Sequence, residues 1–329
     1  MRYKYLISGF ILFLLQAIVF YSVFCYLFPF KEQLQMFQFT EQYAAVTLKQ
    51  AGGVVLYMAE FLSQFYVVLW IGPVITAFLL TAVAIFSSLI LKKICLRDDL
   101  PFIYLLPWLS LLIMHLDYDY FEQGTIAYLF LLFFLWLYMN LKPAIRFFYG
   151  ICIIPLLYLI AGPITHLFAV SAFLFEFLIN GTKKYICIIY LPVAVISAVA
   201  GCYSGYSPNI VMAFLPDAYY NPQVHNSQIC YSWYALPAAM LLAAFLKKYN
   251  SPVSFKGKCR WVGFQWAIIF LLGYESIIHF GKIDALDQFQ QDYYVRTGQW
   301  DKIIAGFDQT VLSKRRMCNL NLALAQTGQ

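Results

Sequence analysis

Long apolar stretches separated by short polar segments fill the first 280 residues of the chain. Nine of them predict membrane helices, because about 20 apolar residues are needed to span a bilayer core. Their predicted bounds are residues 5–28, 67–91, 100–116, 125–141, 147–160, 164–179, 185–203, 231–245 and 261–280. The pattern predicts an all-α polytopic membrane bundle of about nine transmembrane helices over residues 1–280.

The apolar stretch 147–179 is interpreted as two of these helices. Its only charged residue is Glu176. One helix of this length would be about 50 Å long at 1.5 Å per residue, whereas the bilayer core is about 30 Å thick. Gly162 and Pro163 lie at the centre, in the sequence AGPITH, and this pair typically breaks a helix. We therefore predict a helical hairpin.

Composition supports a membrane protein. The chain is 62% hydrophobic and 12% charged, and its mean hydropathy is +0.71, whereas soluble domains carry about 25% charged residues. The first stretch is too long for the apolar region of a signal peptide. It is followed by CYLFPFKEQ, which has no small-residue cleavage site. It is therefore predicted to remain as a membrane helix.

Basic residues predict the orientation of the bundle. With a cytoplasmic N-terminus, fourteen of the 22 Lys and Arg residues fall in inner segments, two in outer loops and six in the C-terminal tail. This excess follows the positive-inside rule. We predict a bacterial cytoplasmic (inner) membrane protein with a periplasmic C-terminus. The net charge of +6 is explained by this orientation, so it does not indicate nucleic-acid binding.

Two outer segments are long. Residues 29–66 predict two short helices separated by Gly52 and Gly53, either at the membrane interface or as a plain hairpin packed on the bundle. Residues 202–231 are rich in Tyr, Asn, Pro and Gly, which suits an interfacial aromatic belt or a carbohydrate-stacking surface. Cys202 and Cys230 flank this loop and could form a disulfide.

Residues 281–329 are polar and amphipathic. DYYVRTGQWDKIIAGFDQ resembles a tetratricopeptide-type helix pair, with Gly298 at the turn and Trp300 opening the second helix. NLNLALAQTGQ resembles the start of another repeat. About three repeats are needed for stability, so we interpret this region as a partial, truncated helical-repeat segment.

The sequence resembles two families. KEQLQMF, GGVVLYMAEFLSQFY, YFEQG, GQWDKII and NLNLALA resemble uncharacterised polytopic membrane proteins of gut Bacteroidota, over most of the chain. That resemblance implies no activity. The layout also resembles the GT-C membrane glycosyltransferases, in its long first outer loop, early acidic residue, second acidic motif and outer C-terminal segment. This resemblance implies sugar transfer from a polyprenyl-phosphate-linked donor at the outer face.

The glycosyltransferase resemblance implies a candidate site. The early acid would be Glu32, or alternatively Glu41, and the second motif would be Asp117 and Asp119 in HLDYDYFEQG. A carboxylate could act as general base, and the aspartate pair could hold Mg²⁺ or Mn²⁺ against a lipid phosphate. Equally, such residues are ordinary solvated helix ends, which is our interpretation of Glu122. The candidate substrate-binding residues are His166, His225, Glu275 and His279.

Two acids interrupt predicted membrane helices, and such residues are functional candidates. Glu275 and His279 share a helix face at i, i+4 spacing and could form an ion pair. Glu176 lies seven residues before Lys183, so its side chain could simply reach the inner interface.

Three functions follow from these patterns. The best specific hypothesis is a glycosyltransferase that uses a polyprenyl-phosphate lipid in the bilayer. The alternative is a membrane anchor that presents a helical-repeat domain to an envelope protein. A transporter ranks third, because paired broken helices and an internal repeat are missing from the sequence. Convergence of Glu32, Asp117 and Asp119 would favour the enzyme, and their separation would favour the anchor.

Overall fold

The computed structural model describes residues 2–179, 186–207, 209–220, 230–248, 254–307 and 314–328. Within these residues every regular element is a helix. The α-helices are α1 (Arg2–Phe24), α2 (Leu27–Leu34), α3 (Glu41–Lys49), α4 (Gly53–Ser63), α5 (Ile71–Cys95), α6 (Pro101–His115), α7 (Glu122–Asn140), α8 (Pro143–Ala161), α9 (Thr165–Ile179), α10 (Tyr190–Tyr203), α11 (Ile210–Phe214), α12 (Pro216–Tyr220), α13 (Ala235–Leu246), α14 (Phe255–Phe280), α15 (Ile283–Arg296), α16 (Trp300–Ala305) and α17 (Lys314–Thr327). Short 3-10 helices cover Gln64–Val67 (η1), Gly162–Ile164 (η2), Ile186–Ile189 (η3) and Cys230–Tyr234 (η4).

Each predicted membrane helix coincides with a helix of the bundle, namely α1, α5, α6, α7, α8, α9, α10, α13 and α14. Among the described residues, five stretches are long and apolar enough to cross a membrane, and one of these is the continuous stretch Pro143–Leu178. The helices α6, α10 and α13 are apolar but shorter. The all-helical fold is thus confirmed, whereas nine crossings stay a prediction.

The predicted break in 147–179 is present. α8 ends at Ala161, η2 follows, and α9 begins at Thr165 and packs back on α8. Gly162 has a φ of 78°, a left-handed conformation that costs glycine little. The break therefore forms the hairpin that the Gly-Pro pair predicted.

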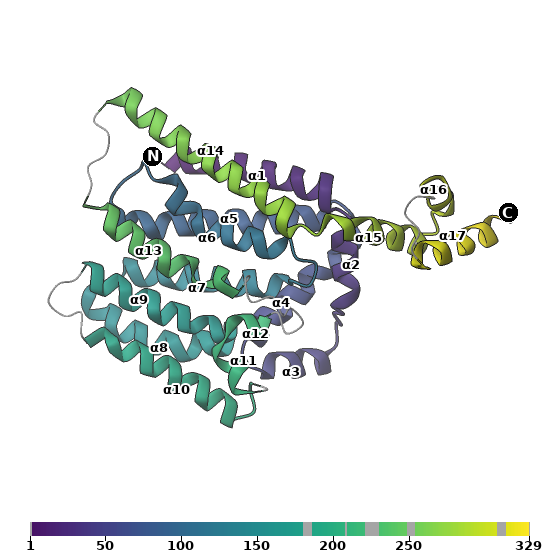
Figure 1. Cartoon of the computed structure of the whole chain (residues 1–329). Coiled ribbons are helices and arrows are strands. Elements are labelled where there is room, and N and C mark those ends of the chain that lie inside the picture. Colours follow the sequence, from purple (N-terminus) through teal and green to yellow (C-terminus); the bar gives the residue numbers. More distant parts are fainter. Residues whose placement is uncertain are drawn as a thin grey trace.

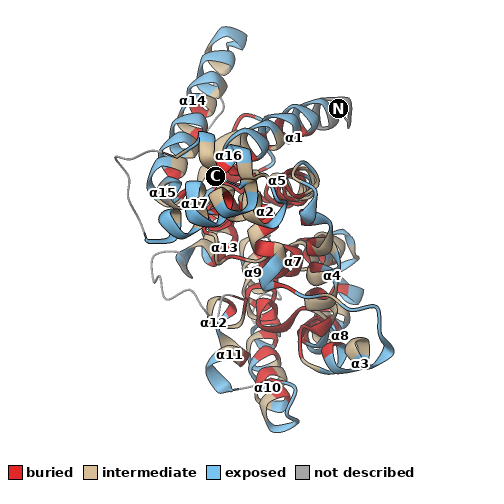
Figure 2. Ribbon diagram, turned by 90° about the vertical axis from the view of Figure 1, so that its right-hand side faces the viewer, coloured by how far each residue is buried: buried red, intermediate tan, exposed pale blue. Residues whose placement is uncertain are grey.

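The bundle helices run side by side, with the connections gathered at two ends (Figure 1). We name these ends inner and outer, after the orientation that the basic residues predict. The outer end carries α2, α3, α4 and the loop between α6 and α7. Buried residues concentrate on the central helices, including α5, α7 and α9, whereas α1 and α14 are largely exposed (Figure 2). The core is therefore centred on α5 and α7, and α1 and α14 lie at its periphery.

The tail leaves the outer end. α15 follows α14 after a turn at Gly281 and Lys282, and α15, α16 and α17 extend away from the bundle (Figure 1). Gly298 adopts a φ of 66°, and α16 opens at Trp300, so the predicted helix pair is confirmed. Gly52, with a φ of 78°, likewise separates α3 from α4. A tetratricopeptide identity of the tail stays a prediction.

Candidate functional site at the outer end of the bundle

A tight turn between α6 and α7 builds the outer site. The amide of Asp117 donates to the carbonyl of Met114 at 3.1 Å, and the amide of Asp119 donates to Oδ1 of Asp117 at 3.1 Å. An aspartate side chain that bonds the backbone two residues later is a common turn device. The turn places Tyr120 next to Gly124, where an added Cβ would lie 2.7 Å from the tyrosine hydroxyl oxygen. Glycine is therefore required for this close packing.

Seven polar side chains gather beneath this turn, and we call them the outer cluster. They come from α2, η1, α5, α6, α7 and the turn itself, and each is at most 2% exposed. The members are Lys31, Tyr66, Thr76, His115, Tyr120, Glu122 and Thr125. Burial of two charged residues and a histidine at such a low exposure is unusual and requires internal partners.

Hydrogen bonds join part of the outer cluster. The hydroxyl of Thr76 donates to Oε1 of Glu122 at 2.8 Å. Thr125 Oγ1 lies 2.7 Å from His115 Nε2 and 2.8 Å from the Tyr120 hydroxyl. The other carboxylate oxygen, Glu122 Oε2, is 3.5 Å from His115 Nε2. The histidine therefore lies between a threonine hydroxyl and a carboxylate.

The outer cluster is incompletely satisfied within the described part of the chain. Glu122 Oε2 and the Tyr66 hydroxyl are buried without a hydrogen-bond partner, and the Lys31 ammonium forms no ion pair or hydrogen bond with a described residue. Burial lowers the pKa of Lys31, and the carboxylates of Glu122, Asp117 and Asp119 oppose that effect. A buried polar group without a partner costs about 1–3 kcal/mol, so this arrangement lowers the stability of the fold.

The position of Glu122 corrects the sequence interpretation. It was expected to be a solvated helix start, but it is 1% exposed, because α2 and η1 cover the beginning of α7. Lys31, Tyr66 and Thr76 were missed altogether. One feature of the sequence could have identified Lys31 as a candidate site residue: it is one of only two basic residues in the predicted outer loops.

Asp117 and Asp119 lie at the edge of the outer cluster. The Lys282 ammonium donates to both carboxylate oxygens of Asp117, at 2.9 and 3.1 Å, and lies 4.0 Å from the Tyr118 ring centroid. Burial and the neighbouring Asp117 charge raise the pKa of Asp119. The residues described contain no group of three or more His, Cys, Asp or Glu that could hold a metal ion. With a lysine on Asp117, the donor set does not fit Mg²⁺ or Mn²⁺.

Glu32 does not join this pair. Its carboxylate lies 3.8 Å from Nη1 of Arg296. Lys282 and Arg296 flank opposite ends of α15, a helix of 14 residues and so about 20 Å long at 1.5 Å per residue. Glu32 and Asp117 therefore contact opposite ends of the same tail helix. The alternative early acid, Glu41, begins α3 and is exposed.

The remaining predicted site residues are dispersed. His166, on α9, contacts the carbonyl of Ala213 at 3.3 Å and stacks on Phe214 with ring centroids 5.1 Å apart. Glu275 and His279 are exposed on α14 and form the predicted i, i+4 pair at 3.4 Å. His225 lies outside the described residues, as does the side chain of Cys230, the proposed partner of Cys202.

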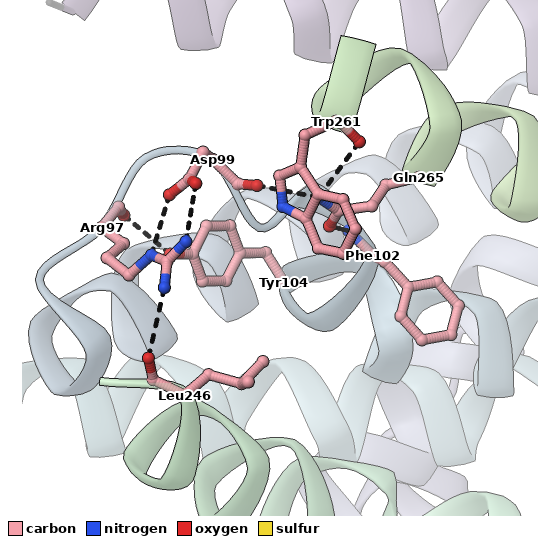
Figure 3. A network of polar contacts seen from close by, with 7 residues as sticks. All are labelled: Arg97, Asp99, Phe102, Tyr104, Leu246, Trp261 and Gln265. Atoms are coloured by element: carbon pink, nitrogen blue, oxygen red, sulfur yellow. Dashed lines mark hydrogen bonds and ion pairs between the residues drawn. The ribbon is translucent and has the colours of Figure 1, made fainter. Parts of the chain in front are cut away.

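Buried charges nearer the inner end are directly paired, and we call Arg97–Asp99 and Arg146–Glu176 the inner pairs. Arg97 donates two hydrogen bonds to Asp99, at 2.9 and 2.7 Å, and a third to the carbonyl of Leu246 at 3.3 Å (Figure 3). Arg146 donates to Glu176 at 2.8 Å. Glu176 therefore has a structural partner on α8 and does not merely reach the interface.

The whole chain, from residue 2 to residue 329, matches one family of unknown function (DUF6057). No curated protein and no solved structure matched the chain. The family match therefore assigns no activity to this helical fold. Because the match covers nearly the complete sequence, the chain belongs to DUF6057, a family of unknown function.

Proposed function

We propose that the protein is a membrane anchor that holds its C-terminal helices in a fixed orientation for contact with an envelope protein. In this proposal residues 1–280 are the membrane domain and residues 281–329 are the presented segment. The N-terminus is cytoplasmic and the membrane is the bacterial cytoplasmic (inner) membrane. One observation supports the proposal above all others, which is the interface between α2 and α15.

Aromatic contacts form the centre of the α2–α15 interface. Phe289 of α15 stacks on Phe30 of α2 with ring centroids 4.3 Å apart, and the Tyr118 ring lies 5.7 Å from Phe289. Tyr26 contacts Tyr293 and Tyr294 at centroid distances of 5.5 and 5.7 Å. Each such pair contributes about 0.5–1.5 kcal/mol beyond the apolar area that it buries. Together they oppose free rotation of the tail.

Polar contacts fix the two ends of the same helix. At its start, Lys282 bonds Asp117. Towards its end, Gln33 donates to Asp292 at 2.9 Å, and Arg296 donates to the carbonyl of Pro29 at 3.1 Å. Isolated exposed ion pairs contribute little to the stability of a fold. Contacts at both ends of α15, however, determine its direction relative to the bundle. Glu32 and Asp117, two of the three acids expected to be catalytic, thus contact the tail at opposite ends of α15, and this separation favours the anchor.

The outer helices of the tail remain available to a partner. α17 is linked to α15 by Arg315–Asp292 at 3.2 Å and Arg316–Asp287 at 2.8 Å. On α17, Met317 and Leu322 are 39% and 41% exposed. Helical-repeat segments bury apolar faces by stacking against a neighbouring element. An amphipathic helix that is held at the outer end and exposes apolar side chains is therefore suited to contact another protein.

The anchor proposal is tested by measuring how rigidly the tail is held. Spin labels would be placed on Cys318 of α17 and on an introduced cysteine at Val46 of α3, with the exposed cysteines Cys152 and Cys259 replaced by serine. Double electron–electron resonance should give a narrow distance distribution for the parent protein and a broad one for Phe289→Ala. Phe307→Ala is the matched control, because it makes the same truncation outside the α2–α15 interface. A broad distribution in the parent protein, or equal widths in both variants, would contradict the proposal.

A second candidate function is the GT-C-like transfer of sugar from a polyprenyl-phosphate-linked donor. It is supported by the unpaired Lys31 ammonium beside the incompletely bonded Glu122 carboxylate. In this hypothesis Lys31 contacts the lipid phosphate and Glu122 is the general base for the acceptor hydroxyl. An added polyprenyl phosphate should then raise the unfolding midpoint of the wild type but not that of Lys31→Met. Equal shifts, or no shift in the wild type, would eliminate this candidate.

A further inference from the structure

A cavity of about 540 Å³ lies between α1, α5, α6 and α14, towards the inner end of the bundle. α1 packs on α5, and α14 packs on α6, so the cavity lies between two helix pairs. Its volume falls within the range of about 300–1,000 Å³ found for small-molecule sites. Its walls come from both peripheral helices and from the bundle core.

The cavity is polar at one end and apolar along its length. Lys92 of α5 and Lys258 of α14 line it near the inner end, together with Asp98. Farther along α1, α5, α6 and α14, its lining is mainly apolar and includes Leu12, Ala84, Ile85, Leu105 and Val262. A ligand that fills it must therefore combine a charged head with an apolar chain.

The charged end carries a surplus of one positive charge. Lys92 pairs with Asp98 at 2.7 Å. Lys258, in contrast, forms no ion pair with any other residue that the structure describes. A head group that bears a phosphate would compensate the Lys258 ammonium and leave the Lys92–Asp98 pair intact.

Polar contacts join two of the helices that line the cavity. Gln265 of α14 donates to the carbonyl of Asp99 at 2.8 Å and accepts from the amide of Phe102 at 3.3 Å (Figure 3). Asp99 is in turn bonded to Arg97. These contacts tie α14 to the start of α6 beside the cavity, so hydrogen bonds hold together one of the two helix pairs that line it. A site that is already formed loses less free energy on binding.

The two peripheral helices that line the cavity present an apolar surface to their surroundings. Only 22% of the apolar stretch of α1 and 17% of that of α14 is buried inside the protein. Both helices expose large apolar side chains, including Phe10, Phe264 and Phe270. Trp261 stands three residues after Lys258 on α14, and tryptophan is enriched at the level of lipid head groups.

We propose that the cavity between α1, α5, α6 and α14 binds an anionic phospholipid, with its phosphate at Lys258 and an acyl chain along the apolar wall. Basic pockets between membrane helices on the cytoplasmic side bind anionic head groups in this way. The lipid would fill the space between the two least buried helices and fasten α14, from which the tail continues. The site is independent of the anchor proposal, because binding does not require the tail to be docked.

Native mass spectrometry of the full-length protein in detergent tests the site. Dioctanoyl phosphatidylglycerol should bind, dioctanoyl phosphatidylcholine should bind several-fold more weakly, and glycerol phosphate should not bind at the same concentration. Lys258→Gln should weaken phosphatidylglycerol binding about fivefold, which corresponds to the roughly 1 kcal/mol that one basic residue contributes near a lipid surface. Lys256→Gln, which removes the same charge from an exposed position on α14 outside the cavity, should leave binding unchanged.

A second variant keeps the test independent of Lys258. Val262→Trp adds bulk to the apolar wall without altering the charge, so it should also weaken phosphatidylglycerol binding. Equal affinities for the two lipids, equal effects of Lys256→Gln and Lys258→Gln, or full binding by Val262→Trp would each overturn the proposal. Binding of glycerol phosphate alone would show that the site takes a free phosphate group and not a lipid.

Discussion

The outer cluster and the inner pairs are both sets of buried charges in an apolar bundle, but they are satisfied to different degrees. Arg97 and Arg146 each contact a carboxylate directly and also donate to a backbone carbonyl. Lys31 has neither contact among the described residues, and Glu122 leaves one oxygen unbonded. Buried ion pairs are favourable only when their geometry and hydrogen bonds are good. The inner pairs meet this condition, and the outer cluster does not.

This difference separates structural charges from candidate functional ones. Arg146–Glu176 joins the consecutive helices α8 and α9, whereas Arg97–Asp99 lies in the connection between α5 and α6, where Arg97 also bonds the carbonyl of Leu246 at the end of α13. The outer cluster retains an ammonium and a carboxylate at a cost in stability. Perturbed, incompletely paired groups gather at functional sites more often than elsewhere. We therefore assign stability to the inner pairs and regard the outer cluster as the candidate for chemistry at the outer end of the bundle.

The largest expected effect is at Arg146 and Glu176. Arg146→Met should lower the free energy of unfolding by about 3–5 kcal/mol, because it leaves the Glu176 carboxylate buried without its partner. Arg146→Met/Glu176→Gln should remain destabilised, since Arg146 also donates to the carbonyl of Leu141 at 2.9 Å. Chemical unfolding in detergent micelles would measure both. A double variant as stable as the wild type would show that the pair is dispensable.

The corresponding double substitution at the outer cluster should act in the opposite direction. Lys31→Met/Glu122→Gln removes two incompletely satisfied charges, so stability should stay unchanged or rise by about 1–4 kcal/mol. Lys31→Met alone should be destabilising, because it leaves Glu122 without the nearby positive charge. The same unfolding measurement applies. Strong destabilisation of the double variant would place the outer cluster in the same class as the inner pairs.

A smaller effect is expected at the edge of the outer cluster, where Asp117 and Asp119 differ. Asp117→Asn should weaken docking of α15 by about 1 kcal/mol, because it removes the ion pair with Lys282. Asp119→Asn should be nearly silent, since its carboxylate is already disfavoured by burial and by Asp117. Limited proteolysis in the segment after α15 would report docking. Equal loss of docking in both variants would show that Asp119 also holds α15, contrary to this prediction.

The smallest effect concerns Glu60 of α4, a half-buried acid that accepts a hydrogen bond from the Tyr43 hydroxyl. Burial raises the pKa of Glu60 from 4.5 to about 7. Its contribution to stability is therefore fully present below pH 4.5 and is lost as the pH rises through 7. Glu60→Gln should reduce the change in the free energy of unfolding with pH. The reduction should be less than about 1 kcal/mol, because the Glu60 carboxyl group is partly exposed. Identical thermal profiles from pH 5 to 8 for the variant and the wild type would contradict it.

Local sequence signals predicted the helices well and the site poorly. Gly162 with Pro163, Gly52 with Gly53, and Gly298 before Trp300 each marked a helix boundary, because glycine adopts the left-handed backbone at little cost. The site depended on contacts between α2, η1, α5 and α7, which no local pattern encodes. Glu122 looked solvated for this reason. Lys31 looked like an ordinary loop residue.

The sequence by itself determined the all-helical class, the apolar helices long enough to cross a membrane and the positions of the turns. These properties follow from side-chain hydrophobicity and backbone preferences, which act over a few residues. Only the tertiary structure decided which charges are buried and which are paired. The exposure of a charged side chain depends on which other helices cover it. Whether it is paired depends on whether one of those helices supplies a residue of opposite charge within contact distance. Thus Lys282, directly before α15, forms an ion pair with Asp117. α2 places Lys31 near Glu122, but Lys31 forms no ion pair or hydrogen bond with a described residue.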